Sequence, residues 1–103
     1  MTEQTLFILA SLAGGERHGY AIAGEVGTLS EGRIRLTAGT LYGALTRLAE
    51  SGLVEASGEE RVDGRRRRYY RITGAGQSAL AEQVAHLQAT VRAVAPRAGA
   101  APA

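Results

Sequence analysis

The stretch TAGTLYGALTRLAES, residues 37–51, decides the fold of this chain. Thr37 is a good N-cap residue and Gly52 follows the stretch directly, so we predict a helix between them. Apolar residues recur at helical spacing on one side and form a candidate core stripe: Leu41, Ala44, Leu45 and Leu48. The stretch therefore predicts an amphipathic helix that packs on a core.

The opposite side of this helix carries small and hydroxyl residues instead of a dense charge. Its members are Gly39, Gly43, Thr46 and Glu50, with Thr40, Tyr42 and Arg47 on the flanks. Each glycine costs roughly 1 kcal/mol of helix stability relative to alanine. A close approach of the helix backbone to base edges in the major groove of DNA would offset that cost, whereas the general richness in glycine (14 residues) is the alternative explanation.

A β-hairpin is predicted on the C-terminal side of this helix. Residues 53–57 and 67–72 read as strands, and residues 58–66, centred on Asp63-Gly64, connect them. In the second strand Tyr70 and Ile72 share one face, which we expect to point inward.

A long helix is predicted after the hairpin, from the N-cap Thr73 to Val94, because Pro96 forbids its continuation. Its apolar residues are spaced 4, 3, 4 and 3 apart and form a heptad seam: Leu80, Val84, Leu87, Val91 and Val94. A monomer would expose this seam to water, so the seam predicts a partner helix.

Two helices are predicted on the N-terminal side. The first, from Glu3 to Ala13, is apolar nearly all round and therefore has to be covered on more than one side. The second runs from about His18 to Leu29, with an apolar face of Ile22, Val26 and Leu29. Residues 33–36 alternate between arginine and an apolar residue, which is typical of a very short strand.

The order of these elements is that of a winged helix-turn-helix, mostly α with a small β-hairpin wing. We expect a winged-helix DNA-binding domain over residues 1–72, a C-terminal dimerisation helix over 73–94 and a flexible tail over 95–103. In this arrangement the helix of residues 37–51 is the recognition helix.

The basic charge is concentrated in the predicted wing. The whole chain has a net charge of +2, and all twelve of its basic residues are arginine, which together with the richness in alanine and glycine is typical of a high-GC bacterial genome. Four consecutive arginines lie in the hairpin: Arg65, Arg66, Arg67 and Arg68. Such a cluster suits phosphates or the minor groove, and a solvated surface loop is the alternative.

The composition argues against several other classes. Without cysteine the chain can form neither a disulfide nor a thiolate metal site, and two isolated histidines, His18 and His86, do not make a metal site. No serine has a histidine and a carboxylate at a familiar spacing, and no glycine-rich phosphate loop is present. No apolar run approaches 18 residues. We therefore expect a cytoplasmic protein that is not an enzyme and needs no cofactor.

Several motifs in register resemble the PadR-type transcriptional regulators. They cover about residues 6–82 and comprise His18-Gly19-Tyr20 with Ile22, Gly39-Thr40-Leu41-Tyr42, Leu45 with Arg47-Leu48, Gly52-Leu53-Val54, and Arg68 to Thr73 followed by Gly76. The resemblance implies a dimeric repressor with a winged DNA-binding domain, and the single C-terminal helix looks like the short subgroup. Ala38 and Gly43 stand where the family commonly has proline.

Pattern and resemblance together give a set of expected DNA contacts: Thr37, Gly39, Thr40, Tyr42, Gly43, Thr46, Arg47 and Arg65 to Arg68. Some of these residues have a purely structural alternative. Thr37 would then only cap its helix, Tyr42 would pack against the wing, and Arg47 would pair with Glu50 or Ser51. A winged-helix module that binds protein instead of DNA is the alternative function, but it calls for apolar residues on the outer face of the recognition helix.

A two-fold dimer would cover the seam of the last helix and the second apolar face of the first. The expected interface residues are Leu6, Leu9, Leu80, Val84, Leu87, Val91 and Val94. A symmetric dimer would place two recognition helices on half-sites of a pseudo-palindromic operator in double-stranded DNA. A small-molecule effector is compatible with this hypothesis, but no residue points to its identity.

Overall fold

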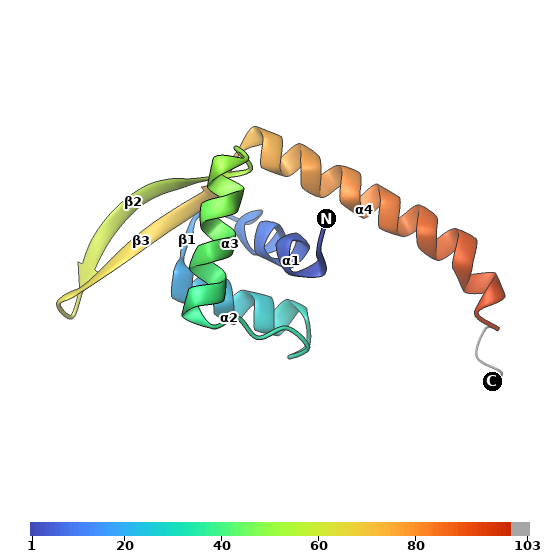
Figure 1. The fold of residues 1–103 in the computed structure, drawn as a ribbon, viewed down its shortest axis with the longest axis horizontal. Helices are drawn as coiled ribbons and strands as arrows, with labels where there is room; N and C mark the ends of the chain where they lie inside the picture. Colours follow the sequence, from blue (N-terminus) through green and yellow to red (C-terminus); the bar gives the residue numbers. More distant parts are fainter. Residues whose placement is uncertain (100–103) are drawn as a thin grey trace.

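The computed structural model describes residues 1–99, in which four α-helices and three strands follow one another (Figure 1). The elements in chain order are α1 (Glu3–Leu12), β1 (Arg17–His18), α2 (Gly19–Leu29), α3 (Ala38–Glu50), β2 (Val54–Val62), β3 (Arg65–Ile72), α4 (Gly74–Val94) and a 3-10 turn (Ala95–Arg97). The fold is a mostly helical winged helix-turn-helix, as the sequence predicts.

The core lies where α1, α2 and α3 meet the base of the sheet. It consists of Ile8, Leu9, Leu12, Ile22, Val26, Leu41, Ala44, Leu45, Leu48, Val54 and Tyr70. The predicted core stripe of α3 is wholly buried, and Tyr70 on β3 points inward as expected. The third predicted residue on the apolar face of α2, Leu29, is an exception, because it is 42% exposed at the last turn of the helix. The next residue, Ser30, is buried instead, and its hydroxyl accepts a hydrogen bond from the Ile34 amide at 3.0 Å.

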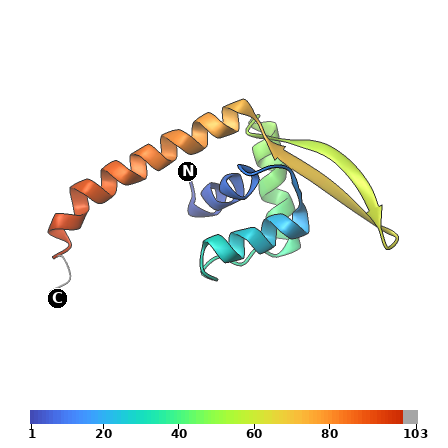
Figure 2. The same cartoon turned by 180° about the vertical axis from the view of Figure 1, so that it is seen from behind.

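The hairpin has longer strands than the sequence predicts. β2 and β3 are paired from Val54–Ile72 out to Val62–Arg65, with an irregularity at Ser57. Asp63 and Gly64 make a two-residue turn with φ values of 52° and 76°, the left-handed pair that a tight hairpin requires. The predicted connection of residues 58–66 is therefore mostly strand, and the wing is a ribbon that extends away from the core (Figures 1 and 2).

A third strand, which the sequence analysis missed, lies at the other edge of β3. Arg17 and His18 pair with Tyr70 and Tyr69, so the sheet order is β1-β3-β2. The strand predicted at residues 33–36 does not form, because the edge of β3 is already occupied by β1. Ile34 and Leu36 instead pack as irregular chain against the core.

Helix α4 projects from the body of the domain (Figures 1 and 2). The molecule measures 55 × 27 × 21 Å, and its radius of gyration of 15.8 Å exceeds the roughly 13 Å of a compact chain of this size. The helix ends at Val94, and Pro96 lies in the 3-10 turn that follows. Of the predicted flexible tail over 95–103, residues 95–97 form this turn, and residues 100–103 lie outside the described part of the chain.

A tight contact fixes the base of α4 to the start of β2. The Thr73 hydroxyl caps the helix by accepting from the Gly76 amide at 3.0 Å, and it donates to the Gly52 carbonyl at 2.6 Å. A Cβ atom on Gly76 would overlap the carbonyl oxygen of Leu53 and lie 2.7 Å from Cγ1 of Ile72. Only glycine lets the helix approach the strand this closely.

Gly76→Ala should therefore destabilise the protein by about 1–3 kcal/mol, the usual cost of forcing extra atoms into a packed site. Urea unfolding followed by circular dichroism measures this difference. Gly74→Ala is the matched control, since nothing lies within 4 Å of a Cβ at Gly74 in the same first turn. Equal stability of the two variants would contradict the close approach.

Candidate nucleic-acid interface

The outer face of α3 presents hydroxyl groups and bare backbone to solvent. Thr37, Gly39, Thr40 and Thr46 are exposed, and nothing lies within 4 Å of a Cβ built on Gly39. Thr37 caps the helix, because its hydroxyl oxygen accepts from the Thr40 amide at 3.3 Å. Thr46 donates its hydroxyl proton to the Tyr42 carbonyl at 2.8 Å, which leaves its oxygen free to accept.

Two larger side chains flank this face. Tyr42 is 44% exposed, and its ring lies over Gly19 at the start of α2, where an added Cβ would come within 2.5 Å of the hydroxyl oxygen. The side chain therefore packs on the start of α2. Arg47 lies back along the helix, with Nη1 at 3.6 Å from the position of a Cβ on Gly43. Among the described residues, Arg47 forms no ion pair with Glu50.

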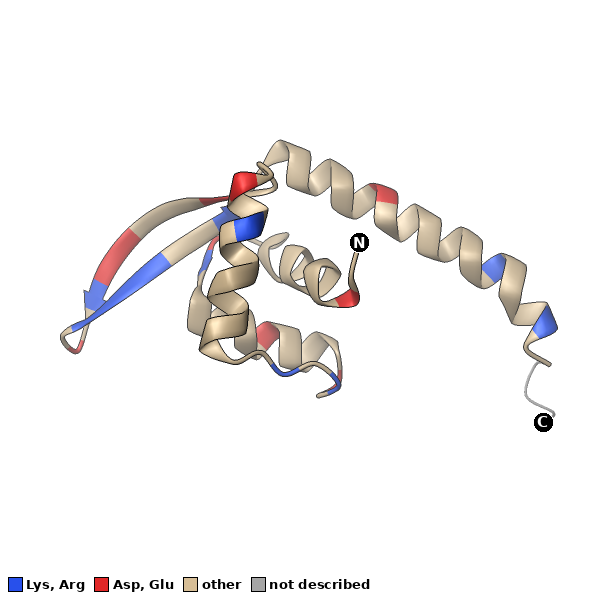
Figure 3. Ribbon diagram, in the orientation of Figure 1, with Lys and Arg blue, Asp and Glu red and all other residues tan. Residues whose placement is uncertain are grey.

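The register of the hairpin divides the four wing arginines between its two faces, because successive side chains alternate along a strand. Arg66 and Arg68 share one face, and both lie near the carboxylate of Glu59, at 3.7 and 3.5 Å. Arg65 and Arg67 share the other face. In Figure 3 the basic residues of β3 lie beside a β2 that carries acidic residues. The arginines therefore do not form one continuous row.

Tyr69 is held on the same face as Arg67. Its hydroxyl donates to Glu60 Oε1 at 2.8 Å, and its ring stands edge-on to that of His18 with the centroids 5.5 Å apart. The hydrogen bond to Glu60, together with partial desolvation, raises the pKa of Tyr69, because both favour the neutral phenol. Tyr69 is therefore a neutral donor committed to Glu60.

A depression of about 110 Å³ joins α3 to the wing. Its lining residues are His18, Gly19, Tyr20, Tyr42, Arg65, Arg66 and Arg67, and we call it the wing depression. It brings together the predicted contacts Tyr42, Arg65, Arg66 and Arg67, whereas Arg68 lies outside it.

Three lining residues of the wing depression were not among the predicted contacts, namely His18, Gly19 and Tyr20, and the side chain of Tyr20 is 82% exposed. The signal was present in the helical phase of α2. Tyr20 is two positions before Ile22, about 200° around the helix, so burial of Ile22 turns Tyr20 outward.

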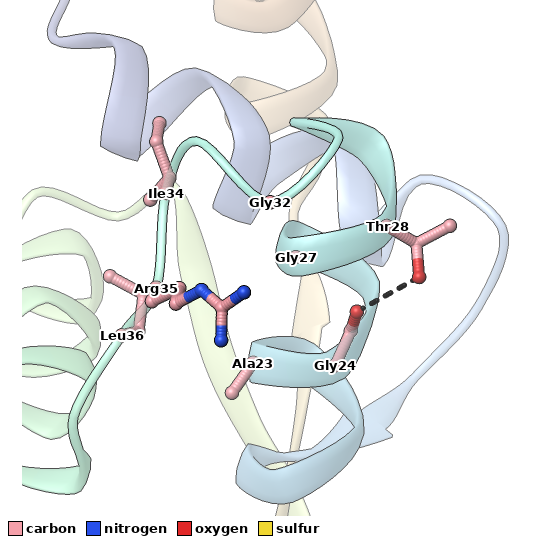
Figure 4. Close-up of a pocket in the computed structure, with 8 residues that line it drawn as sticks. All are labelled: Ala23, Gly24, Gly27, Thr28, Gly32, Ile34, Arg35 and Leu36. Atoms are coloured by element: carbon pink, nitrogen blue, oxygen red, sulfur yellow. Dashed lines mark hydrogen bonds between the residues drawn. The ribbon is translucent and has the colours of Figure 1, made fainter.

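A larger groove, of about 460 Å³, lies along α2 and is lined mostly by small residues (Figure 4). Ala23, Gly24 and Gly27 form its floor, and the side chain of Arg35 reaches across it. Arg35 is exposed, and the Thr28 hydroxyl is occupied by the Gly24 carbonyl at 3.2 Å. Shape alone therefore distinguishes this groove, and shape does not define a ligand.

The outward stripe of α4 is apolar, and no other part of residues 1–99 covers it. Val84, Leu87, Val91 and Val94 are 42, 39, 62 and 53% exposed, and three of them line a shallow groove along the helix. Leu80 and Leu6 are half-buried, and Leu80 packs against the core. Leu9, which the sequence analysis placed at an interface, is fully buried in its own protomer and belongs to the core.

Within residues 1–99, no group of three or more histidine, aspartate or glutamate side chains is placed to hold a metal ion. None of the helices described is both long enough and apolar enough to cross a membrane.

A recognition helix with a polar outer face, beside a wing rich in arginine, defines a DNA-binding transcriptional regulator of the winged helix-turn-helix class. The model of the transcriptional regulator PadR-like family matches residues 8–82, and the chain belongs to this family. The family consists of regulators and not of enzymes.

Three similar proteins illustrate the relationship. The transcriptional regulator Rv3488 of Mycobacterium tuberculosis is 43% identical over 89 residues, which cover 86% of this chain and 79% of that protein. A PadR family regulator of Clostridium difficile has the same fold, with a TM-score of 0.76 at 23% identity over 90% of this chain and 95% of that one. Bacillus subtilis PadR, solved in complex with operator DNA, aligns with a TM-score of 0.68 at 20% identity over 78% of this chain and 46% of its own.

Proposed function

We propose that this protein is a homodimeric repressor that binds a pseudo-palindromic operator. In each protomer α3 enters the major groove through Gly39, Thr40, Gly43 and Thr46, and the wing arginines contact the neighbouring backbone. The observation that carries this proposal is the outer face of α3, where hydroxyl groups and bare backbone are exposed together. A protein-binding module would instead need an apolar outer face on α3.

The stripe on α4 supports the dimer. The proposed interface pairs the α4 helices of two protomers through Val84, Leu87, Val91 and Val94, with Leu80 at its inner end and Leu6 of α1 beside it. An uncovered stripe of this kind is typical of a surface that binds another protein. A two-fold axis along this interface would set the two α3 helices on successive half-sites.

The repressor role follows from steric exclusion. A dimer that covers two half-sites of a promoter would keep other proteins from that DNA, and a PadR relative is known in complex with an operator. Its place of action would be the cytoplasm, together with the DNA. An effector that changes the pairing of α4 would release the DNA, because the spacing of the α3 helices depends on that pairing.

Selection of duplexes from a random library by the full-length protein tests this function. We expect an inverted repeat whose half-site centres are about 10 base pairs, or a multiple of that, apart. Placing the selected sequence within a reporter promoter should lower transcription when the protein is present. A library from which no sequence is enriched at low salt would refute DNA recognition, and raised transcription would refute the repressor role.

A further inference from the structure

The polar residues that line the wing depression all have side chains that can donate hydrogen bonds. They come from β1, α2, α3 and β3 and are His18, Tyr20, Tyr42, Arg65, Arg66 and Arg67. The depression of about 110 Å³ equals the space of a few waters at roughly 30 Å³ each, so it suits a small ion and not a drug-sized molecule.

The tautomer of His18 determines whether its Nε2 atom acts as a hydrogen-bond donor in the depression. The Ala21 amide donates to Nδ1 of His18 at 3.2 Å and so caps α2 through the ring. A neutral imidazole has one donor and one acceptor, so the cap makes Nδ1 the acceptor and puts the ring proton on Nε2. Nε2 lies 3.3 Å from Nη1 of Arg67, and a guanidinium nitrogen can only donate. Two donors therefore face each other, and each needs an acceptor from outside the pair.

Within residues 1–99, no carboxylate forms an ion pair or a hydrogen bond with the side chain of His18 or Arg67. Glu60 is opposite Arg67 in the hairpin, but its Oε1 accepts from the Tyr69 hydroxyl at 2.8 Å. Glu59 is on the other face of the ribbon, near Arg66 and Arg68. An acceptor for His18 and Arg67 that also complements the positive charge has to be an anion.

We propose that the wing depression binds one phosphodiester group of the operator backbone. His18 Nε2–H and the Arg67 guanidinium donate to its oxygens, and the Tyr20 hydroxyl donates from the α2 side. The inference rests on the proposed function, since Tyr42 of α3 and Arg65 of the wing border the same depression and would bring a duplex against it. His18 thus links the cap of α2 to phosphate binding.

The experiment measures how the affinity for the selected duplex depends on salt, by fluorescence anisotropy. Each phosphate contact contributes about 0.9 to the slope of log affinity against log salt, so Arg67→Gln should lower the slope by about that amount. Arg71→Gln is the matched control, because it removes the same charge from a β3 residue that pairs with Glu55 at 2.6 Å outside the depression. We expect the slope of the control to equal that of the wild type.

Two further variants distinguish the loss of a hydrogen-bond donor from damage to the fold. His18→Asn keeps a side-chain oxygen that can cap α2 but removes the Nε2 donor, and Tyr20→Phe removes only an exposed hydroxyl. Both should weaken binding severalfold while circular dichroism stays unchanged. Wild-type affinity in both, or an unchanged slope in Arg67→Gln, would overturn the inference and leave the proposed function standing.

A neutral methylphosphonate placed at each backbone position in turn identifies the phosphate. We expect one position in each half-site where this change weakens the wild type but not Arg67→Gln. The same loss in both proteins at every position would overturn the contact. Titration of the DNA-free protein with inorganic phosphate, followed on the His18 ring by NMR, tests the other source of this chemistry. Saturable, Arg67-dependent binding with an unaltered DNA slope would assign the depression to a free anion and refute the proposal. Failure of the proposed function itself would appear earlier, as a selection without enriched duplexes.

Discussion

Val84→Asp combined with Val91→Asp should convert the dimer to monomers and abolish tight operator binding, although neither residue is near α3. Each substitution places a carboxylate in the exposed stripe of α4, where the proposed pairing would bury it without a partner. Loss of the second half-site should lower the operator affinity by about 10²–10⁴-fold, the range by which linked binding modules exceed single ones. Sedimentation equilibrium and anisotropy measure the two effects on the same samples.

Ala89→Asp combined with Ala93→Asp is the matched control for this prediction. These residues lie on the opposite side of α4, so they add the same charge outside the stripe. The control should remain a dimer and keep its operator affinity. A wild-type chain that sediments as a monomer at micromolar concentration would refute the dimer.

Gly43→Leu should abolish operator binding while the protein folds at least as stably as the wild type. A Cβ at Gly43 would meet only Nη1 of Arg47 at an ordinary 3.6 Å, and a helical glycine costs about 1 kcal/mol relative to better helix formers. The leucine side chain would stand on the outer face of α3 and hold the backbone away from the base edges. Thermal unfolding and anisotropy should therefore change in opposite directions.

Gly24→Leu provides the comparison on α2. Nothing lies within 4 Å of a Cβ at Gly24, so this variant should also fold, and it should bind the operator as the wild type does. If Gly43→Leu retained wild-type affinity, the outer face of α3 would not enter the groove.

The sequence predicted α3 almost completely, because every local signal there agrees. Thr37 caps the helix, Ser51 and Gly52 end it, and the core stripe has a regular helical spacing. The heptad spacing likewise predicted the exposed stripe of α4, since a long helix with few neighbours keeps its sequence pattern visible at the surface.

The sheet was predicted less well, because its pairing depends on residues far apart in the chain. The charged ends of β2 and β3 look like a loop until the ladder pairs Glu59 with Arg68 and Glu60 with Arg67. β1 has only two residues, too few for an alternating pattern, so the sequence predicted His18 at the start of a helix. The contact between His18 and Arg67 spans 49 positions, and only the fold brings the two residues together.

The joint between β2 and α4 has a mechanical consequence. Helix α4 has 21 residues and is about 32 Å long, so a tilt of about 10° at its base moves the far end by about 6 Å. That displacement exceeds the rise of one base pair, roughly 3.4 Å. In the proposed dimer the two α4 helices together set the separation of the two α3 helices. A change of angle where either α4 meets β2 would therefore place one α3 helix against the wrong base pair. The close contact of Gly76 with the Leu53 carbonyl, which leaves no space for a methyl group, would therefore limit the error with which the proposed dimer spaces its two α3 helices on DNA.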